Sequence, residues 1–426
     1  MTAMIRLRRL AQINPPTPAF DRLVEDSEVT FMPLETVWAD QRLDVSRVRS
    51  KATVAAGYVR FQAADVLCPK VTPTFQAGRS ALIPELPSGV GAASTEVHVV
   101  RAHPGIADPR FVRYALLTKP FLEEGVSRFQ GVAGLQRVPD DFLREFSVID
   151  FTLEEQQRIA DFLDDQVFRI DNIIEARRRQ TDLADHVLQA EIERIWLPRQ
   201  QAPMRHVLDV PREEDVPASW SIRPLGAFLS RITYGFTNPM PATDEGPYML
   251  TAADIGDGQI SYGTARRTSE EAFTGLITAK SRPETNDVLL TKDGTLGRVA
   301  EADGRPCCIN QSVALLRPHA EYADGAIAEI LRVRAYREAL VFNAGGTAIK
   351  HLYISRVAAQ KVAMPPSNVR ASMVAESRKA RSHFDFGLRS LTQSVELLHE
   401  LKRSLITAAM MGDFETSAAD GSRVPV

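Results

Sequence analysis

The chain of 426 residues lacks the features that mark membrane, secreted and metal-binding proteins. It contains no run of about 18 apolar residues, so we expect no membrane-spanning helix. Its three cysteines, Cys68, Cys307 and Cys308, are too few and too badly spaced for a disulfide framework or a zinc site. The basic residues of segment 1–12 are followed by no apolar segment and no small-residue cleavage site, so no secretion signal is expected. Together these absences favour a cytoplasmic protein.

Catalytic motifs are missing as well. There is no GxSxG, no HExxH and no GxxxxGK[ST] sequence. The acid-x-Lys pattern of metal-dependent nucleases is absent, because Cys68 lies two residues before Lys70. The same holds in the second half of the chain, where Leu290 lies two residues before Lys292. Residues 238–241 (NPMP) lack the aromatic that the amino-methyltransferase motif uses to stack on a flipped base. The sequence therefore favours a binding protein over an enzyme.

An excess of positive charge is also missing. The chain has 51 Lys and Arg against 54 Asp and Glu, a formal net charge of −3. Many nucleic-acid-binding domains are basic overall, so this balance counts mildly against DNA as a partner. It does not exclude DNA, because phosphate contacts depend on where the charges lie, and other subunits of a complex can supply many of them.

One segment without Pro or Gly, residues 152–196, indicates a long amphipathic helix. Its start has the pattern of a capping box, in which Thr152 caps the helix and Glu155 reaches back. At about 1.5 Å per residue the helix would be roughly 65 Å long, which suits a strut or a coiled-coil strand better than a core element. Apolar residues recur every three or four positions at Ile159, Leu163, Ile170, Ile173, Ile174, Leu183, Val187, Ile192 and Ile195.

The two halves of the chain repeat each other at an offset that drifts between roughly 214 and 222 residues, as insertions in loops would cause. A period of half the chain is not a solenoid; it indicates a duplicated unit of one globular domain plus one long helix. The sequence therefore predicts a molecule with pseudo-two-fold symmetry. The matching segments are 65–67 (DVL) with 287–289, Lys70 with Lys292, 97–103 (VHVVRAH) with 313–319 (VALLRPH), and 134–138 (GLQRV) with 348–352 (AIKHL).

A second long helix is expected after Pro366, over residues 367–412, with Gly387 as its one interruption. Residues 152–196 hold eleven acids against six arginines, a balance of −5, and residues 368–411 hold seven bases against four acids, a balance of +3. We therefore expect the two helices to pack antiparallel and to hold the two globular blocks apart. The alternative is that each helix packs only on its own domain. The heptad seam of the second helix is Phe384, Leu391, Leu398 and Leu405, with Leu388, Val395 and Leu401 beside it.

Loops of both blocks are rich in side chains suited to nucleic acids. Amides pair with adenine, Arg or Lys pairs with guanine, and Thr, Lys and backbone N–H groups hold phosphates. Any one of these residues alone is more often a solvated surface residue, but the set as a group favours DNA contact. In the first block the candidates are Lys70, Thr72, Thr74, Arg79, Arg128, Gln130, Gln136 and Arg137. In the second block they are Tyr234, Thr237, Asn238, Lys292, Thr295, Arg298, Asn310, Gln311, Thr347, Lys350 and His351.

Over nearly its whole length the sequence resembles the specificity subunits of Type I restriction–modification systems. The resemblance rests on the order domain–helix–domain–helix and on four segments. These are 151–164 (FTLEEQQRIADFLD), 287–300 (DVLLTKDGTLGRVA), 308–318 (CINQSVALLRP) and 396–412 (ELLHELKRSLITAAMMG). Three features depart from the family pattern. Residues 14–18 (NPPTP) match the YGFTNP entry of the second block poorly. Residues 66–73 (VLCPKVTP) lack the Asp-Gly-Thr turn of the second block, and the second helix lacks the EEQQ start.

The resemblance implies an α+β fold in which two tandem α/β-type target recognition domains are separated by two long helices that form an antiparallel coiled coil. The expected boundaries are 1–150 and 220–366 for the recognition domains, 151–197 and 367–412 for the long helices, 198–219 for a linker, and 413–426 for a flexible tail.

The resemblance also implies a function. Each recognition domain would read one half of a bipartite site in double-stranded DNA, while the coiled coil would set the spacing and dock two modification (methyltransferase) subunits. Restriction subunits would join that core. The chain would be non-catalytic and would bind no cofactor, because S-adenosylmethionine, ATP and Mg²⁺ would be bound by the partner subunits. Two alternatives stay open: a coiled-coil adaptor that joins protein-binding domains, and an undetected nuclease or methyltransferase.

Overall fold

The computed structural model describes residues 3–37, 43–131, 136–197, 216–342, 344–345 and 350–413. The chain packs into two compact units, which we call unit 1 (Met1–Arg179 and Leu391–Val426) and unit 2 (Gln180–Ser390). Each long helix therefore contributes one part to each unit. Most of the expected linker, residues 198–215, and all but the first residue of the expected tail, residues 414–426, lie outside the described residues.

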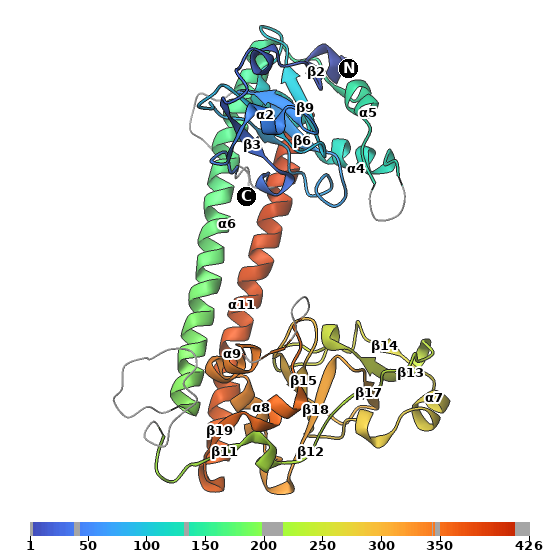
Figure 1. Cartoon of the computed structure of the whole chain (residues 1–426), viewed down its shortest axis with the longest axis vertical. Helices are drawn as coiled ribbons and strands as arrows, with labels where there is room; N and C mark the ends of the chain where they lie inside the picture. Colours follow the sequence, from blue (N-terminus) through green and yellow to red (C-terminus); the bar gives the residue numbers. More distant parts are fainter. Residues whose placement is uncertain are drawn as a thin grey trace. The chain divides into compact units, whose positions relative to one another are not determined.

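The chain contains two long helices of 44 residues each, α6 (Leu153–Trp196) and α11 (Ser367–Met410) (Figure 1). The capping box at the start of α6 is formed, because the backbone N–H of Glu155 donates to Thr152 Oγ1 (3.3 Å) and that of Thr152 donates to Glu155 Oε2 (2.8 Å). At about 1.5 Å per residue each helix is roughly 66 Å long. Helix α11 passes through Gly387 without a break, so the expected interruption is wrong, and the two helix predictions are confirmed.

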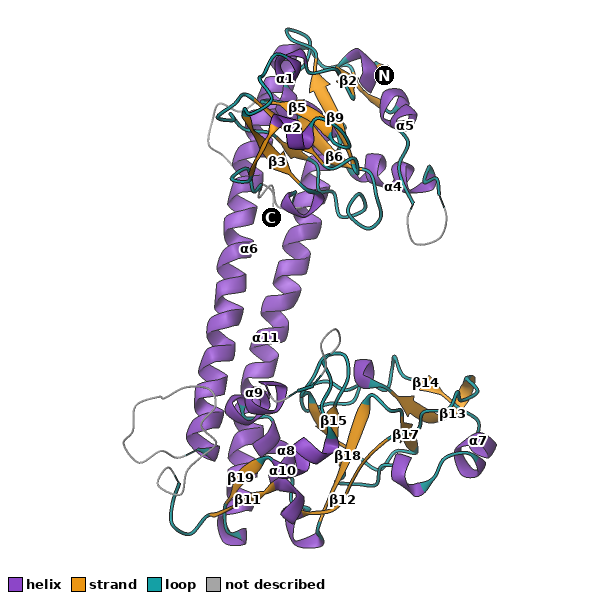
Figure 2. Ribbon diagram, viewed as in Figure 1, coloured by secondary structure: helices purple, strands orange, loops and turns teal. Residues whose placement is uncertain are grey.

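Unit 1 contains two four-stranded sheets and one strand pair (Figure 2). The first sheet is antiparallel throughout, with the order β2 (Ala11–Ile13), β9 (Val97–Ala102), β6 (Val66–Pro69) and β7 (Ala81–Leu82). The second has the order β4 (Val48–Ser50), β3 (Glu28–Met32), β8 (Val90–Ala93) and β5 (Val59–Gln62), with β3 parallel to β8. The pair is β1 (Met4–Arg6) with β10 (Ser147–Ile149). Unit 1 also has the helices α1 (Pro18–Asp21), α2 (Lys51–Val54), α3 (Pro109–Ala115), α4 (Lys119–Ser127) and α5 (Asp140–Glu145).

Unit 2 repeats this plan. Its antiparallel sheet has the order β12 (Leu229–Tyr234), β18 (Val313–Pro318), β15 (Val288–Thr291) and β16 (Val299–Glu301). A second sheet has the order β14 (Arg266–Arg267), β13 (Thr243–Leu250) and β17 (Cys307–Ile309), with β13 parallel to β17. The pair is β11 (Ser221–Pro224) with β19 (Lys361–Met364). Unit 2 also has the helices α7 (Glu270–Gly275), α8 (Ala326–Leu331), α9 (Arg334–Phe342) and α10 (Ile354–Ala359).

The strand register confirms the internal repeat. Val66 of β6 lies opposite Val100 of β9, and their counterparts Val288 and Leu316 lie opposite each other in unit 2. The residue before each inner strand is a buried aspartate that forms a two-bond ion pair with an arginine of the neighbouring strand. These pairs are Asp65 with Arg101 (2.7 and 2.8 Å) and Asp287 with Arg317 (2.8 and 2.7 Å). Both the fold and its polar contacts are therefore duplicated.

The core of each unit contains residues of both long helices. In unit 1, Leu163 of α6 packs in one cluster with Ile406 of α11 and Phe111 of α3. In unit 2, Ile192 of α6 shares a cluster with Val374 of α11. The first part of α6 thus lies beside the last part of α11, and the reverse holds in unit 2, which confirms the antiparallel prediction. The alternative that each helix packs only on its own domain is wrong, since both cores use both helices.

Some of the apolar residues in the expected helix patterns are exposed. On α6, Ile173, Leu183 and Val187 are 46%, 65% and 48% exposed, and on α11 Leu401 is 54% exposed. The next residue, Lys402, is the one that is buried. The four heptad positions of α11, Phe384, Leu391, Leu398 and Leu405, are all partly buried, so on this helix the exposed residue of the expected pattern is the flanking Leu401.

Candidate nucleic-acid interface

Several candidate residues of unit 2 meet at one edge of its antiparallel sheet. Strands β12 and β15 end at this edge and β18 begins there, because Tyr234 lies opposite Ala314 and Thr291 lies opposite Val313. The loops beyond the strands are joined by backbone hydrogen bonds. The N–H of Lys292 donates to the carbonyl of Ser312 (2.9 Å), and that of Leu352 donates to the carbonyl of Lys292 (2.9 Å). Lys292 therefore lies between the segment that carries Asn310 and Gln311 and the segment that carries His351.

The loop after β15 is a fixed turn. Thr291 Oγ1 accepts a hydrogen bond from the N–H of Arg298 (2.9 Å) and donates to the carbonyl of Thr295 (2.5 Å). Gly294 and Gly297 have φ angles of 74° and 79°, in the left-handed region where glycine is strongly preferred. The turn leaves Thr295 exposed, while Arg298 is half-buried. The conformation of the turn is set by hydrogen bonds between its own residues. Its side chains therefore hold their positions without a bound partner molecule.

Positive charge gathers around the Tyr234 ring. Lys292 Nζ lies 5.7 Å from the ring centroid and Lys280 Nζ lies 5.9 Å from it. Lys292 also forms an ion pair with Asp293 (2.6 Å), whereas Lys280 is exposed on the surface. An exposed aromatic ring beside two ammonium groups is suited to a phosphate backbone and to stacking. The sequence reasoning missed Lys280, because no motif connects it to the turn after β15.

The two amide residues between β17 and β18, Asn310 and Gln311, have different roles. Asn310 Oδ1 accepts hydrogen bonds from the N–H and hydroxyl groups of Ser312 (3.0 and 2.5 Å), so its side chain holds the turn. Gln311 is exposed, and its backbone N–H donates to Phe236 O (2.9 Å). A Cβ at Gly235 would lie 1.8 Å from Ile309 O, so only glycine allows the end of β12 to come this close.

The other candidates of unit 2 are more peripheral. Thr237 and Asn238 are exposed in the loop after β12, and Lys350 is exposed before His351. The His351 ring lies edge-on to the Tyr353 ring with centroids 4.4 Å apart, and its backbone pairs with Gly345. Thr347 lies outside the described residues.

In unit 1 the loop around Lys70 has the same backbone hydrogen-bond pattern as the loop around Lys292, and we call this shared pattern the loop scaffold. The N–H of Lys70 donates to Glu96 O (2.9 Å), and the N–H of Val138 donates to Lys70 O (2.9 Å). These bonds match those of Lys292 in unit 2, so the two lysines are equivalent. Next along the loop, the N–H of Thr72 donates to Gln136 O (3.1 Å), which brings three of the candidates together. The shared backbone pattern survives although residues 66–73 lack the Asp-Gly-Thr turn.

Several unit 1 candidates already have partners. Arg137 forms a two-bond ion pair with Glu96 (2.8 Å each), and this hydrogen bonding holds the pKa of Glu96 below its usual value. Arg137 would have to exchange that partner to contact DNA. Thr74 Oγ1 donates to Val71 O (2.7 Å), a bond within the turn. Of the remaining candidates, Arg128 is exposed with an ion pair to Glu124 (3.7 Å), Gln130 pairs with Arg137 through the backbone, and Arg79 is half-buried.

A buried histidine supports this loop and was missed by the sequence reasoning. His98 is 4% exposed, its Nε2 lies 2.9 Å from Val138 O, and its Nδ1 lies 3.2 Å from Asn14 Nδ2. Burial lowers the pKa of His98. A neutral ring that donates to Val138 and accepts from Asn14 satisfies both contacts. Only the three-dimensional contact across the sheet reveals this role.

The described residues offer little for redox or metal chemistry. Burial raises the pKa of the Cys68, Cys307 and Cys308 thiols to about 12, so they stay protonated at neutral pH. Within the ranges that the structure describes, no group of three or more His, Cys, Asp or Glu side chains could hold a metal ion. Of the helices in those ranges, none is long and apolar enough to cross a membrane.

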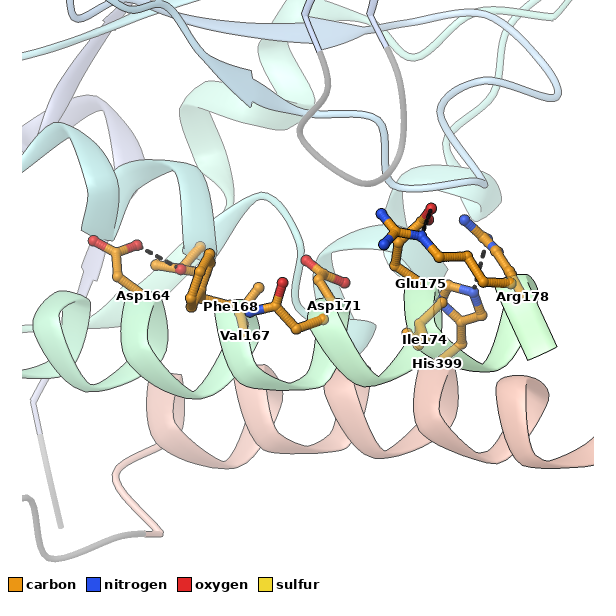
Figure 3. A pocket seen from close by; sticks show the side chains of 11 residues that line it. Asp164, Val167, Phe168, Asp171, Ile174, Glu175, Arg178 and His399 are labelled. Atoms are coloured by element: carbon orange, nitrogen blue, oxygen red, sulfur yellow. Dashed lines mark hydrogen bonds and ion pairs between the residues drawn. The ribbon is translucent and has the colours of Figure 1, made fainter. Parts of the chain in front are cut away.

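Unit 1 also has a groove of about 560 Å³ along α6, lined in addition by Tyr114 of α3 and His399 of α11 (Figure 3). The Tyr114 hydroxyl donates to Asp164 (2.7 Å). Phe168, on the groove wall, is 66% exposed. The groove is a concave surface made mainly by the long helices rather than by the loops.

Parts of the chain are similar in sequence to known proteins. No family model matches it. The Type I restriction enzyme EcoAI specificity subunit of Escherichia coli is 30% identical over 156 residues, which are 36% of this chain and 26% of that protein. The EcoEI specificity subunit of the same organism is 27% identical over 172 residues, 40% of this chain and 28% of that protein. The matched segments thus span little more than a quarter of the length of these relatives.

A solved structure covers far more of the chain. It comes from work on the structural basis of complex assembly and conformational transition of the type I R-M system, and it matches 97% of this chain and 98% of its own. The TM-score is 0.68 at 17% identity, so the likeness establishes the fold. The α+β prediction, with two α/β domains and an antiparallel pair of long helices, is confirmed. The chain thus shares the fold of that structure, and about two fifths of its sequence is similar to parts of two Type I restriction enzyme specificity subunits.

Proposed function

We propose that this chain is the DNA sequence-recognition subunit of a Type I restriction–modification complex. Residues 1–150 and 220–366 are its two target recognition domains, and each reads one half of a bipartite site in double-stranded DNA. One observation carries the proposal: the loop scaffold that presents Lys70 is built a second time around Lys292 in the same chain. Two equivalent readers in one chain suit a split site, as the two halves of a dimeric protein suit a palindrome.

The long helices set the spacing between the half-sites and dock two modification subunits, and restriction subunits join this core. Helix α6 is acidic, which disfavours close contact with phosphates and suits a protein partner. The groove of unit 1, with exposed Phe168 beside it, is a surface for such a partner. The specificity-subunit family is non-catalytic. S-adenosylmethionine, ATP and Mg²⁺ are bound by the partner subunits, and the complex works in the cytoplasm.

The exposed and half-buried side chains at the two scaffolds are the first candidates for DNA contact. In unit 2 these are Thr295 and Gln311 with the Tyr234–Lys292 pair, and Lys280 joins them. In unit 1 they are Lys70, Thr72 and Gln136. Asn310 and Thr74 act by holding turns, and Arg137 contacts DNA only after leaving Glu96.

Substitution of Lys292 tests the interface. Lys292→Glu replaces a cation beside Tyr234 by an anion, so DNA binding by the complex with its modification subunits should weaken at least tenfold at about 0.1 M salt. Lys379→Glu, an equal charge change at an exposed position of α11, is the matched control and should have a much smaller effect. Equal losses in the two variants, or no loss for Lys292→Glu, would remove this loop from the interface.

A further inference from the structure

The first turn of each long helix buries one polar side chain at the same position. The fourth residue of α6 is Gln156, which is 1% exposed, and the fourth residue of α11 is Arg370, which is 5% exposed. An amide and a guanidinium differ in charge and size, yet they occupy equivalent places in the two halves of the chain. What they share is the ability to donate several hydrogen bonds in different directions.

Gln156 ties the start of α6 to the loop that precedes α3. Its Nε2 donates to Phe151 O (2.9 Å), just before the helix, and to Ile106 O (3.2 Å) in that loop. Its Oε1 accepts from the N–H of Asp108 (3.1 Å). Both ends of the amide are thus used, and two of the three bonds reach the recognition domain.

Arg370 makes the equivalent connection in unit 2. Its Nε donates to Asp324 (2.7 Å), and one of its terminal nitrogens donates to Glu321 O, both in the segment that precedes α8. The other terminal nitrogen donates to Pro365 O (3.4 Å), just before α11. The loops before α3 and α8 are counterparts in the repeat, so both buried side chains join the same two parts of the fold.

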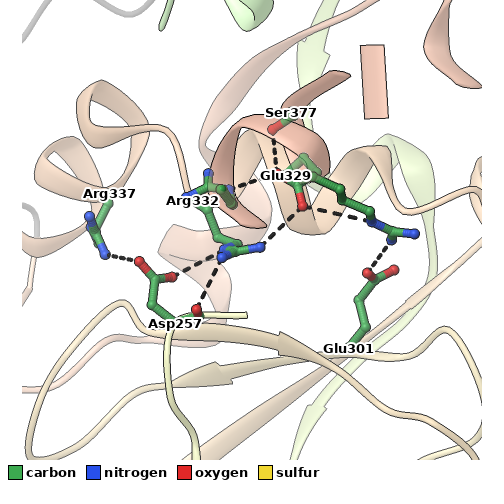
Figure 4. A network of polar contacts seen from close by, with 8 residues as sticks. Asp257, Glu301, Glu329, Arg332, Arg337 and Ser377 are labelled. Carbon is green, nitrogen blue, oxygen red and sulfur yellow. Dashed lines mark hydrogen bonds and ion pairs between the residues drawn. The ribbon is translucent and has the colours of Figure 1, made fainter. Parts of the chain in front are cut away.

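A second contact follows farther along each helix, and its charges are reversed between the units. In unit 1, Arg110 of α3 donates to Asp161 (2.6 Å) and Asp164 (3.0 Å) of α6. In unit 2, Glu329 of α8 accepts from Ser377 (2.6 Å) and Arg381 (3.0 Å) of α11, and Figure 4 shows this network. Glu329 is only 1% exposed. The short helix of each domain thus contacts its long helix at a point distinct from the first turn.

Two separate polar contacts fix the orientation of a recognition domain on its long helix, whereas a single contact would let the domain rotate about that point. The first contact is buried, and its loss leaves backbone groups without partners, which is costly in a protein interior. We propose that Gln156 and Arg370 are positioning residues. They fix the angle at which each recognition domain leaves its long helix, and this angle determines which spacing between the half-sites the complex accepts. This inference rests on the proposed function, but it requires neither residue to touch DNA.

The test measures spacing rather than activity alone. Full-length Gln156→Leu and Arg370→Met chains are combined with the cognate modification subunits and offered DNA sites whose two half-sites are one base pair closer, at the native distance, or one base pair farther apart. The wild-type chain should direct methylation at one spacing. In each variant, methylation at the neighbouring spacings should rise about tenfold relative to the native one, while the bases recognised stay the same.

Exposed residues of the same two types provide the matched controls: Gln157→Leu on α6 and Arg389→Met on α11 should keep the single preferred spacing. If Gln156→Leu does not fold, Gln156→Glu replaces it, because it keeps the acceptor for Asp108 and loses the two donors. A uniform loss at every spacing, with the optimum unchanged, would overturn the positioning role and leave the proposed function standing. A wild-type chain that directs methylation to no particular sequence would overturn the proposed function itself.

Discussion

Lys402 of α11 lies against Asp171 of α6, with its Nζ 2.7 and 2.8 Å from the two carboxylate oxygens. The lysine side chain is 11% exposed and the aspartate side chain 28% exposed, so water screens the pair only in part. The contact lies in unit 1, where the first part of α6 packs beside the last part of α11. The pair joins a negative charge of the acidic helix α6 to a positive charge of the basic helix α11.

Reversing one charge of this pair should destabilise unit 1. Lys402→Glu places two carboxylates together, and we expect the free energy of unfolding to fall by about 3 kcal/mol in urea denaturation. Adding Asp171→Lys should restore most of the loss. As a control, the exposed pair Arg169–Asp165 on α6 can be reversed in the same way, with a change below about 0.5 kcal/mol. The absence of rescue by the second substitution would contradict the pairing.

Two leucines of α6 should differ sharply in what they contribute. Leu163 is fully buried in the core of unit 1, whereas Leu183 is 65% exposed. Leu163→Ala should cost about 3 kcal/mol in thermal unfolding, because it removes core contacts and leaves a cavity. Leu183→Ala should cost less than about 0.5 kcal/mol. Similar losses of stability in the two variants would show that Leu183 is packed against other residues, as Leu163 is.

These helices also show how far sequence reasoning reached. The helix bounds and the Thr152 capping box depend on neighbouring residues, so the pattern of a single segment was enough to predict them. The repeat followed from matching strand segments in the same order. The burial of Lys402 was not predictable in this way, because it depends on Asp171 of the other long helix, 231 positions away in the sequence.

The candidate interface was harder to predict for a similar reason. Its loops were found from residue types, but the state of each side chain depends on partners that are distant in sequence. Arg137 meets Glu96 across 41 positions, and Lys280 reaches the Tyr234 ring from a separate loop. Gln156 was read only as part of the helix start, and its buried role appears once the loop before α3 is placed beside it.

The stability of unit 1 should depend on the protonation of His98. Burial holds the pKa of His98 below its ordinary value, so the unfolded chain takes up the proton at a higher pH than the folded chain. The contribution is therefore complete above about pH 7.5 and is lost as the pH falls through about 6.5 toward the lower pKa of the folded state. His98→Gln should reduce the fall in melting temperature between pH 7.5 and pH 5. An unchanged pH dependence in this variant would show that His98 is not its source.

Exchange of one recognition domain tests the bipartite reading most directly. Residues 1–150 are replaced by the corresponding domain of a known Type I specificity subunit, and methylated bases are mapped across the genome of cells that carry the cognate modification subunit. The predicted result is a motif in which one half is new, while the other half and the spacing are retained. A motif that does not change, or one that changes in both halves, would contradict the assignment of one half-site to each domain.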